Sequence, residues 1–415
     1  MAMTGVSRRT ALGAMGASVI GAAALGARRA SAQSGGVIYF GGSLGMSGRY
    51  AETGLNIRQG YETTIKYLNE ERGGVEIGGK TYRFELAIVD DASDPARATA
   101  LIQRQLDKDM SFFLGSYGSN IVLPCAGITE AAGKLTVQVG ASADQIFEQG
   151  YRNIFGFFPR ASRAWATSVE FFKSLEPKPK KVSIIATNDA FSKLNAQAAA
   201  AGCTAIGLEV LDLLQLPEQV SDASSALATI RARTPDILIT TTVDQNSLVI
   251  VRQMIATDTN VPLLYQFLGP QLPAYRESLG SKATGVIMQL PWDARLAFSD
   301  PIFRDSKSYV AYYNKNNSRP LSYHTVGASA CITTYVQAMR KAGSLDPAKV
   351  RAALAATDIT TAFGPVKFSP EGDGDPILMG AKIGQVQNGE VQVVFPTEVK
   401  TANLIYPTSN WSTKG

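Results

Sequence analysis

The sequence contains one histidine among its 415 residues, His324. A metal site built from several histidines is therefore excluded, and so is an imidazole relay with spare partners; we interpret His324 as a helix cap or packing residue. The motifs G-x-G-x-x-G and C-x-x-C are also absent. Acidic pairs such as Asp90-Asp91 have no evident partner and are interpreted as solvated loop charges. We expect binding without turnover: no catalytic residue, no metal, no cofactor, not an enzyme.

Cysteine is scarce as well. The three cysteines, Cys125, Cys203 and Cys331, are far apart and odd in number, which indicates small buried apolar residues rather than a disulfide framework. None stands near residue 32, the expected cleavage point, where it could carry a lipid anchor.

The first 32 residues differ in composition from the rest. Arg8-Arg9 precedes an uncharged Gly/Ala-rich stretch over residues 11–27, and Ala30-Ser31-Ala32 fits a cleavage site of small residues. This pattern resembles a twin-arginine export signal; a general secretory signal is the alternative. The stretch is short and poor in Leu and Ile, which disfavours a membrane anchor. We expect residues 1–32 to be an export signal and the protein to be periplasmic and not lipid-anchored.

The charge of the chain depends on this segment. Removing residues 1–32 takes away four Arg and no acid, so the formal net charge falls from +5 to +1. A nearly neutral chain has no charge excess for binding nucleic acid or an anionic membrane. We expect neither partner.

Apolar runs alternate with helical patterns up to about residue 290. Strands are expected at residues 36–42, 80–89, 112–114 and 135–139, and again at 151–158, 182–186, 208–213, 236–241, 262–267 and 285–290. Between the strands, apolar residues recur at helical spacing, and Asp94-Pro95 is expected to cap one helix. Such alternation predicts parallel, doubly wound sheets, and the repeated series predicts two lobes.

The alternation stops after residue 291. Helical patterns cover residues 301–316, 323–342 and 347–356, residues 363–368 are strand-like, and residues 383–387 and 391–395 are expected to form a hairpin. We assign the late helices to one lobe and the late strands to the other. The chain then crosses between lobes several times, and lobes joined in this way move as a hinge.

Two of the expected strands end in loops of small, hydroxyl-bearing residues. Residues 115–119 are Gly-Ser-Tyr-Gly-Ser, and residues 140–144 are Gly-Ala-Ser-Ala-Asp. The carboxyl ends of parallel strands share one edge, where free backbone N–H groups and a helix start favour an anionic group. Pro124 is expected in or near the first turn of the following helix. The loops predict a pocket for a small carboxylate-bearing molecule; ordinary strand-to-helix turns are the alternative.

The order of these motifs resembles that of the periplasmic substrate-binding proteins of branched-chain amino acid ABC transporters. The matching stretches are the export signal, Asp90-Asp91-Ala92-Ser93-Asp94-Pro95, the two loops above and Gly269-Pro270. The resemblance implies a type I periplasmic-binding fold: α/β, with two doubly wound parallel-sheet lobes, three crossover strands and a ligand in the cleft. It places residues 36–160 and 292–360 in an N-terminal lobe and residues 161–291 and 361–415 in a C-terminal lobe.

The resemblance also implies the ligand-binding residues. Ser119 and Ser142, with the adjoining Gly118 and the backbone of Tyr117 and Ala141, match positions that hold the ligand carboxylate. The remaining matches cover, cap or line the cleft: Tyr50 and Thr53 in the first loop, Phe191 as a cleft aromatic, Asp244, and Gln271 at the position of the ammonium-binding glutamate.

Two positions depart from the family pattern. Gln271 is neutral, so either Asp244 supplies a carboxylate for an α-ammonium or the ligand has no ammonium; an aromatic or otherwise apolar acid suits the aromatic lining. Ser93 and Gly118 occupy the positions of a disulfide found in some relatives, so we expect no disulfide.

We therefore expect a periplasmic solute-binding protein that closes on a small carboxylate-bearing ligand, either an apolar amino acid or an aromatic acid. A monomer is expected to deliver the ligand to an inner-membrane ABC permease. The alternatives are a ligand-sensing receptor subunit on the same fold, a binder of short amides or urea, and an amidase-like enzyme.

Overall fold

Two β-sheets organise the structure. Late helices join the part of the molecule built around the first sheet, and a late hairpin extends the second sheet. The structure, a computed structural model, describes residues 33–376 and 378–414, apart from the side chains of Gln33 and Asp244. The expected export signal, residues 1–32, lies outside the described residues.

The first sheet has six strands in the order β2-β3-β1-β4-β5-β6. Its members are β1 (Gln33–Leu44), β2 (Val75–Ile77), β3 (Lys80–Asp90), β4 (Phe112–Leu114), β5 (Leu135–Gln138) and β6 (Ile154–Gly156). All neighbours pair in parallel except the β2–β3 hairpin. The short strands β4, β5 and β6 are buried along their whole length, as parallel strands covered on both faces are.

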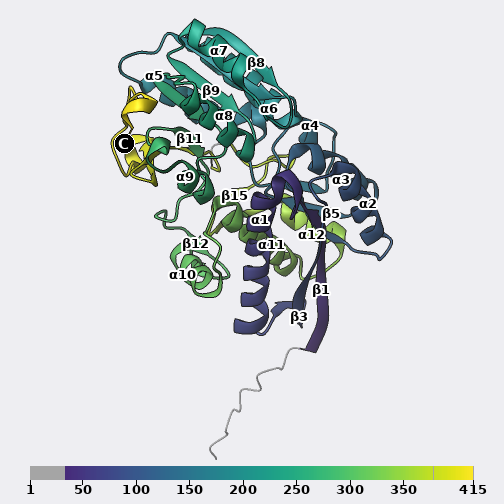
Figure 1. Ribbon diagram of the computed structural model, residues 1–415. Coiled ribbons are helices and arrows are strands. Elements are labelled where there is room, and N and C mark those ends of the chain that lie inside the picture. Colours follow the sequence, from purple (N-terminus) through teal and green to yellow (C-terminus); the bar gives the residue numbers. More distant parts are fainter. Residues whose placement is uncertain (1–32, 377, 415) are drawn as a thin grey trace, which may run out of the picture. The chain divides into compact units, whose positions relative to one another are not determined.

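Helices from both ends of the chain pack with this sheet. They are α1 (Ala51–Lys66), α2 (Pro95–Leu106), α3 (Ser119–Ala131), α4 (Asp144–Phe147), α10 (Ser306–Asn316), α11 (Tyr323–Ala342) and α12 (Pro347–Ala355). Figure 1 shows α1 beside α11. Gly60 permits this approach, since a Cβ there would lie 2.0 Å from the carbonyl oxygen of Thr325. On the other side of α11, the Tyr335 hydroxyl lies 2.9 Å from the carbonyl oxygens of Phe113 and Leu135.

The second sheet has seven strands in the order β17-β16-β11-β10-β9-β7-β8. They are β7 (Lys181–Thr187), β8 (Glu209–Leu216), β9 (Ile237–Thr241), β10 (Leu263–Gln266), β11 (Ile287–Leu290), β16 (Lys382–Gln387) and β17 (Glu390–Phe395), with helices α5 (Ala166–Ser174), α6 (Ala190–Ala205), α7 (Ser224–Arg233), α8 (Asp244–Ala256) and α9 (Pro273–Leu279). The late hairpin β16–β17 adds to β11 in the antiparallel sense.

The chain passes between the sheets three times: after β6, after β11 and before β16. The predicted class, two doubly wound lobes joined by three crossovers, is therefore confirmed. Two of the crossovers are tied together: Gly156 N–H donates to the carbonyl of Gly372 at 2.8 Å, and Arg160 forms a buried ion pair with Asp373 at 3.1 Å. The exact lobe boundaries, at residues 160, 291 and 360, stay a prediction.

Some local expectations need correction. Strands β2 and β14 (Asp358–Thr361) were not expected. β14 pairs with β15 (Gly364–Lys367) in a separate two-stranded sheet. β15 lies within residues 363–368, which were expected to be strand-like. Pro124 is the sixth residue of α3 rather than part of its first turn, because the helix begins directly after Gly118. Asp94 does cap α2, accepting from Arg97 N–H at 2.7 Å.

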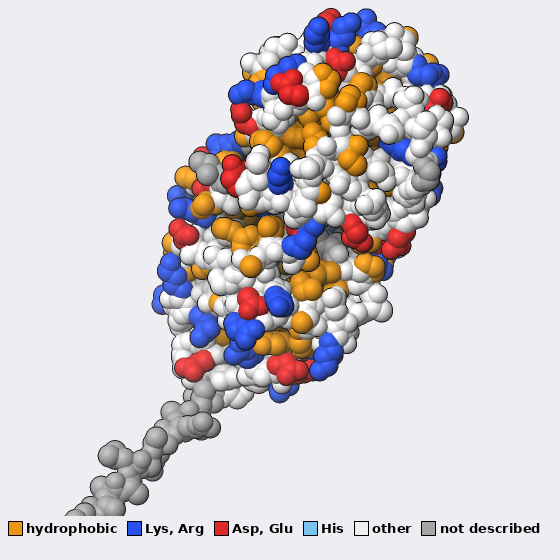
Figure 2. All heavy atoms as spheres, turned by 90° about the vertical axis from the view of Figure 1, so that its left-hand side faces the viewer, with side chains coloured by type: hydrophobic (Ala, Val, Ile, Leu, Met, Phe, Trp, Pro, Cys, Tyr) orange, Lys and Arg blue, Asp and Glu red, His pale blue; other side chains and the backbone are white. Residues whose placement is uncertain are grey.

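The surface shown in Figure 2 carries Lys/Arg and Asp/Glu side chains interspersed, with apolar side chains gathered in several patches. No helix within the described residues has the length and apolar character needed to cross a bilayer. Cys203 and Cys331 are buried and Cys125 is half-buried, and all three are free thiols.

Candidate functional site

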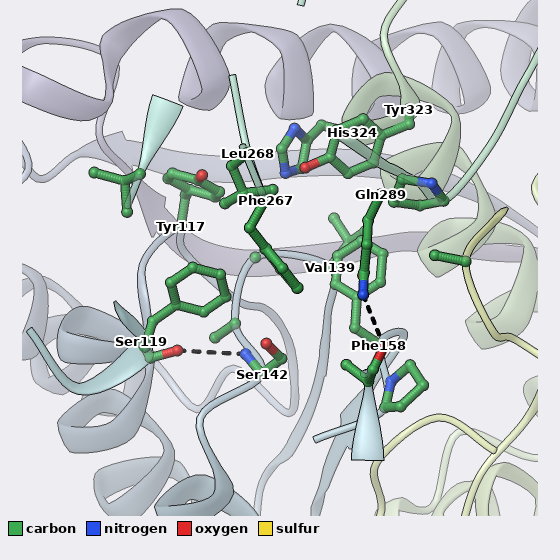
Figure 3. Close-up of a pocket in the computed structure, with 18 of the residues that line it drawn as sticks. Tyr117, Ser119, Val139, Ser142, Phe158, Phe267, Leu268, Gln289, Tyr323 and His324 are labelled. Atoms are coloured by element: carbon green, nitrogen blue, oxygen red, sulfur yellow. Dashed lines mark hydrogen bonds between the residues drawn. The ribbon is translucent and has the colours of Figure 1, made fainter. Parts of the chain in front are cut away.

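One cavity is lined by residues from both sheets. Loops that follow β4 and β5 form one wall, which contains Tyr117, Ser119 and Ser142 and which we call the donor wall. Residues that follow β7 and β10 form the other, which contains Phe191, Phe267 and Gln271 and which we call the acceptor wall. Figure 3 shows the two serines side by side, with Phe158, Phe267 and Tyr323 around the same space.

Ser119 is the first residue of α3, and its hydroxyl is oriented by its neighbours. Its Oγ accepts hydrogen bonds from the backbone N–H groups of Ser142, at 3.3 Å, and Ala143, at 3.2 Å (Figure 3). A serine oxygen has two lone pairs, so both are used and the O–H remains to donate. The side chain of Ser119 therefore offers a hydrogen-bond donor beside Ser142, as an anion requires.

Gln138, at the end of β5, shapes the second loop. Its Oε1 accepts from the N–H groups of Gly140 and Ala141, both at 2.8 Å, and its Nε2 donates to the Ala141 carbonyl at 2.8 Å. The resemblance assigned the backbone of Ala141 to the ligand, but its N–H is already engaged in this structure. Sequence reasoning missed Gln138 because it was counted only as part of a buried strand.

Gln271 is held in one orientation on the acceptor wall. Its Nε2 donates to the backbone carbonyls of Phe267, at 2.7 Å, and Gln289, at 2.6 Å. A flipped amide would put its oxygen against both carbonyls, so chemistry fixes the assignment. The buried Oε1 then has no partner among the described residues. Gln271 therefore places an uncharged amide in the lining where relatives are expected to carry a carboxylate.

Aromatic rings form part of the remaining lining. The lining aromatics are Tyr50, Tyr117, Phe158, Phe191, Phe267 and Tyr323. His324 belongs with them: its ring lies 3.9 Å from that of Tyr323 and meets Tyr117 edge-on at 5.2 Å. Burial lowers the pKa of His324 to about 3, so the imidazole is neutral at pH 7. These rings can enclose a flat apolar body.

Charged side chains in the lining are few. Asp189 has both carboxylate oxygens engaged, one with the N–H of Ser192 at 2.9 Å and the other with the Thr187 hydroxyl at 2.7 Å, as the cap of α6. Arg163, at the start of the segment that leads into α5, is exposed. The Asp189 carboxylate is thus a helix cap, and two of its lone pairs already accept hydrogen bonds.

The opening between the walls is bridged by Glu218, in the loop after β8. Its Oε1 accepts from Arg49 at 2.5 Å and from the Asn120 side chain at 3.2 Å. The Tyr50 hydroxyl donates to Asn120 at 3.2 Å, and the Arg49 guanidinium lies 4.6 Å from the centre of the Tyr50 ring. We call this group the latch. No local pattern marks Glu218, so sequence reasoning did not find it.

The structure brings eight of the ten expected site residues to the cavity: Tyr50, Tyr117, Gly118, Ser119, Ala141, Ser142, Phe191 and Gln271. Thr53 is buried but does not line it, because it lies one turn into α1 from Tyr50, the residue that does. Asp244 is the first residue of α8, and its side chain lies outside the described residues.

Two stretches match functional patterns by letter alone. Residues 41–45 fit G-x-S-x-G, but Ser43 Oγ donates to Asp91 at 2.8 Å, and the single histidine packs on Tyr117 and Tyr323 instead. Residues 74–81 fit G-x-x-x-x-G-K-T, but they form the β2–β3 hairpin rather than a strand, loop and helix. Neither stretch has the structural context of its motif.

Comparison with known proteins identifies relatives over most of the chain. A family model described as periplasmic binding protein matches residues 37–390. An amino acid binding protein of Pseudomonas aeruginosa is 24% identical over 298 residues, covering 70% of this chain and 76% of that protein. A leucine-, isoleucine-, valine-, threonine- and alanine-binding protein of the same organism is 22% identical over 333 residues, covering 79% and 84%.

Solved structures share the fold. A leucine-binding protein from Thermotoga maritima superposes with a TM-score of 0.75 at 18% identity, covering 86% of this chain and 97% of that one. A solute-binding protein of an R. palustris ABC transporter, in complex with benzoate, has a TM-score of 0.73 at 20% identity, covering 90% and 98%. Amino acids and aromatic acids are thus both ligands of proteins with this architecture.

Proposed function

Because this chain belongs to the periplasmic binding protein family, and is a binding protein of the ABC-transporter type rather than an enzyme, we propose that its ligand is a small aromatic carboxylic acid. The acid is held between the donor wall and the acceptor wall. Closure of the lobes buries it, and the closed form delivers it to an inner-membrane permease.

The carboxylate is assigned to the donor wall. The O–H of Ser119 donates to none of the described residues, and Ser142 lies next to it. Two hydroxyl donors can hold one carboxylate, and a hydrogen bond to a charged group contributes roughly 1.5–3 kcal/mol. The partial positive charge at the start of α3 adds to this preference.

The orientation of the Gln271 amide is the main reason for proposing an aromatic acid rather than an amino acid. Its free Oε1 satisfies a neutral donor such as a hydroxyl but supplies no charge for an ammonium. Asp189 uses one oxygen to cap α6 and the other to accept from the Thr187 hydroxyl. An amino acid would place its ammonium beside the neutral amide of Gln271, whereas an aromatic acid would place its ring among the lining aromatics.

Calorimetric titration of the protein with 4-hydroxybenzoate, benzoate and leucine tests the proposal. We expect 4-hydroxybenzoate to bind more tightly than benzoate, and leucine to bind weakly or not at all. Leucine binding alone would contradict the aromatic-acid proposal and would point to Asp244 as the source of the carboxylate. If the protein binds none of the three but binds urea or a short amide, the alternative of an amide or urea binder is favoured.

A transport role is distinguished from a sensing role by uptake. Loss of this protein should abolish uptake of the labelled acid by its host if it serves a permease. Unchanged uptake with a lost transcriptional or chemotactic response would indicate a receptor subunit. We propose a monomer, which size-exclusion chromatography with light scattering would check.

The export route is a separate proposal. The Arg8-Arg9 pair is proposed to direct the folded protein through the twin-arginine pathway, with removal of residues 1–32. Replacing both arginines by lysine should leave uncleaved precursor inside the cell. Normal export of that variant would instead indicate the general secretory route.

A further inference from the structure

Asp91 is a buried carboxylate, contrary to its interpretation as a solvated loop charge. Its exposed fraction is 0%, whereas the neighbouring Asp90 is partly exposed. Asp91 forms no ion pair with any described residue. Burial raises the pKa of Asp91, and hydrogen bonds from Ser116 and Ser43 act against that rise. A buried charge without a cation persists only when donors surround it.

The donors come from three separate segments. Oδ2 accepts from the hydroxyls of Ser43, at 2.8 Å, and Ser116, at 2.7 Å. Oδ1 accepts from the backbone N–H of Ser93 at 2.9 Å. Ser43 is near the end of β1, Ser93 is in the turn after β3, and Ser116 is in the loop after β4. One carboxylate thus joins the ends of three adjacent strands.

Two of these segments lead to the cavity. Ser116 directly precedes Tyr117, Gly118 and Ser119, which line it. Ser93 carries the connection to Tyr50, since its Oγ accepts from the N–H of Tyr50 at 3.0 Å and donates to the carbonyl of Ser47 at 2.7 Å.

The loops approach closely around these bonds. A Cβ at Gly140 would lie 2.1 Å from the carbonyl oxygen of Ser116, so the second loop of the donor wall rests directly on the first. A shift of Ser116 would therefore be transmitted to both loops of the donor wall. We propose that Asp91 is a positioning residue for ligand binding: its carboxylate sets the register of the loops that present Tyr50, Ser119 and Ser142. The inference rests on the proposed function of the cavity.

Asp91→Asn is the test, because it keeps the shape of the side chain but replaces one accepting oxygen by a donor. Asp300→Asn is a matched control. Asp300 is also buried, and it accepts from the N–H groups of Ile302 and Phe303, at 2.8 Å, and Ala362, at 2.7 Å, none of which lines the cavity.

Amide hydrogen exchange of the unliganded proteins provides the first measurement, since it needs no ligand. Asp91→Asn should accelerate exchange at least tenfold in peptides covering residues 43–50 and 115–119, whereas Asp300→Asn should act on residues 300–306 and 362. Unchanged protection of residues 43–50 and 115–119 in Asp91→Asn would overturn the proposal, whichever ligand the protein binds.

Affinity provides the second measurement, with 4-hydroxybenzoate as the probe, or leucine if the wild-type protein binds that instead. Asp91→Asn should weaken binding roughly tenfold to a hundredfold, and Asp300→Asn less than twofold. In a double-mutant cycle, Ser116→Ala should add little to Asp91→Asn, because both break the same bond. If Asp91→Asn and Asp300→Asn cause equally small losses of affinity, Asp91 stabilises the fold but does not position the binding loops. If wild-type protein binds neither probe, the proposed ligand class fails and the exchange measurement still decides the role of Asp91.

Discussion

The two walls of the cavity differ in how their polar groups are arranged. On the donor wall, Ser119 Oγ accepts from two backbone N–H groups of the loop that the Gln138 side chain also holds, and the serine hydroxyls can donate. On the acceptor wall, aromatic rings accompany the fixed amide of Gln271, whose Oε1 is unpartnered among the described residues. We infer that the first wall selects for an anion and the second selects which anion, so changes in the two walls should have different consequences.

The largest expected effect is on the donor wall. The variant Ser119→Ala/Ser142→Ala removes both hydroxyl donors, and each is expected to weaken binding roughly tenfold to a hundredfold. Titration calorimetry with 4-hydroxybenzoate measures the loss. Ser224→Ala is the control, because Ser224 is likewise the first residue of a helix but is exposed and remote from the cavity. Retained affinity in the double variant would show that the donor wall does not bind the ligand carboxylate.

The next prediction tests whether His324, whose ring packs on Tyr117 of the donor wall, is uncharged. The pKa of His324 is lowered to about 3 by burial, against about 6.5 in an unfolded chain. Between these values the unfolded chain binds a proton that the folded protein does not. The free energy of unfolding therefore falls as the pH falls, by about 1.4 kcal/mol per pH unit from this residue, and the stability is fully present above pH 6.5.

Urea unfolding at several values between pH 7 and pH 4.5 measures this slope. His324→Phe should show a flatter dependence than the wild-type protein, while carboxylates such as Asp373 contribute equally to both. An identical slope in the two proteins would mean that His324 is accessible to protons in the folded state.

The acceptor wall should control selectivity more than affinity. Gln271→Met keeps a similar side-chain length but removes the acceptor oxygen. We expect the preference for 4-hydroxybenzoate over benzoate to shrink by roughly tenfold, the contribution of about one hydrogen bond. Because the two ligands are compared in the same variant, any loss of stability from the broken bonds to Phe267 and Gln289 cancels. An unchanged preference would place the hydroxyl elsewhere in the cavity.

The smallest expected effect is at the latch, which joins the two walls. Glu218→Gln keeps the shape but removes the charge that Arg49 contacts. The pair is partly exposed, so we expect ligand dissociation to accelerate by less than about fivefold, and only at low salt. Stopped-flow displacement measures the rate. The swap Arg49→Glu/Glu218→Arg should restore it, and Glu170→Gln, which breaks the exposed pair with Lys173, should not change it.

Most of the fold was predictable because its signals are local. The strands of both sheets follow apolar runs, and the caps Asp94 and Ser322 precede helices α2 and α11 as capping residues do. The short strands β2 and β14 were missed, since such short segments carry little periodicity, whereas β15 lies within the expected residues 363–368. The loops around Ser119 and Ser142 were found for the same local reason: small residues follow an apolar strand.

The sequence by itself determined the order of elements, the two-lobed class and the small-residue loops at the cavity, because periodicity and turn chemistry are properties of neighbouring residues. Only the tertiary structure decided which atoms are available. Asp91 is buried, the Ala141 N–H is engaged by Gln138, and Gln271 turns its oxygen away from two carbonyls. A hydrogen bond depends on partners brought together from different strands, and whether a polar atom is free can be read only once those partners are in place.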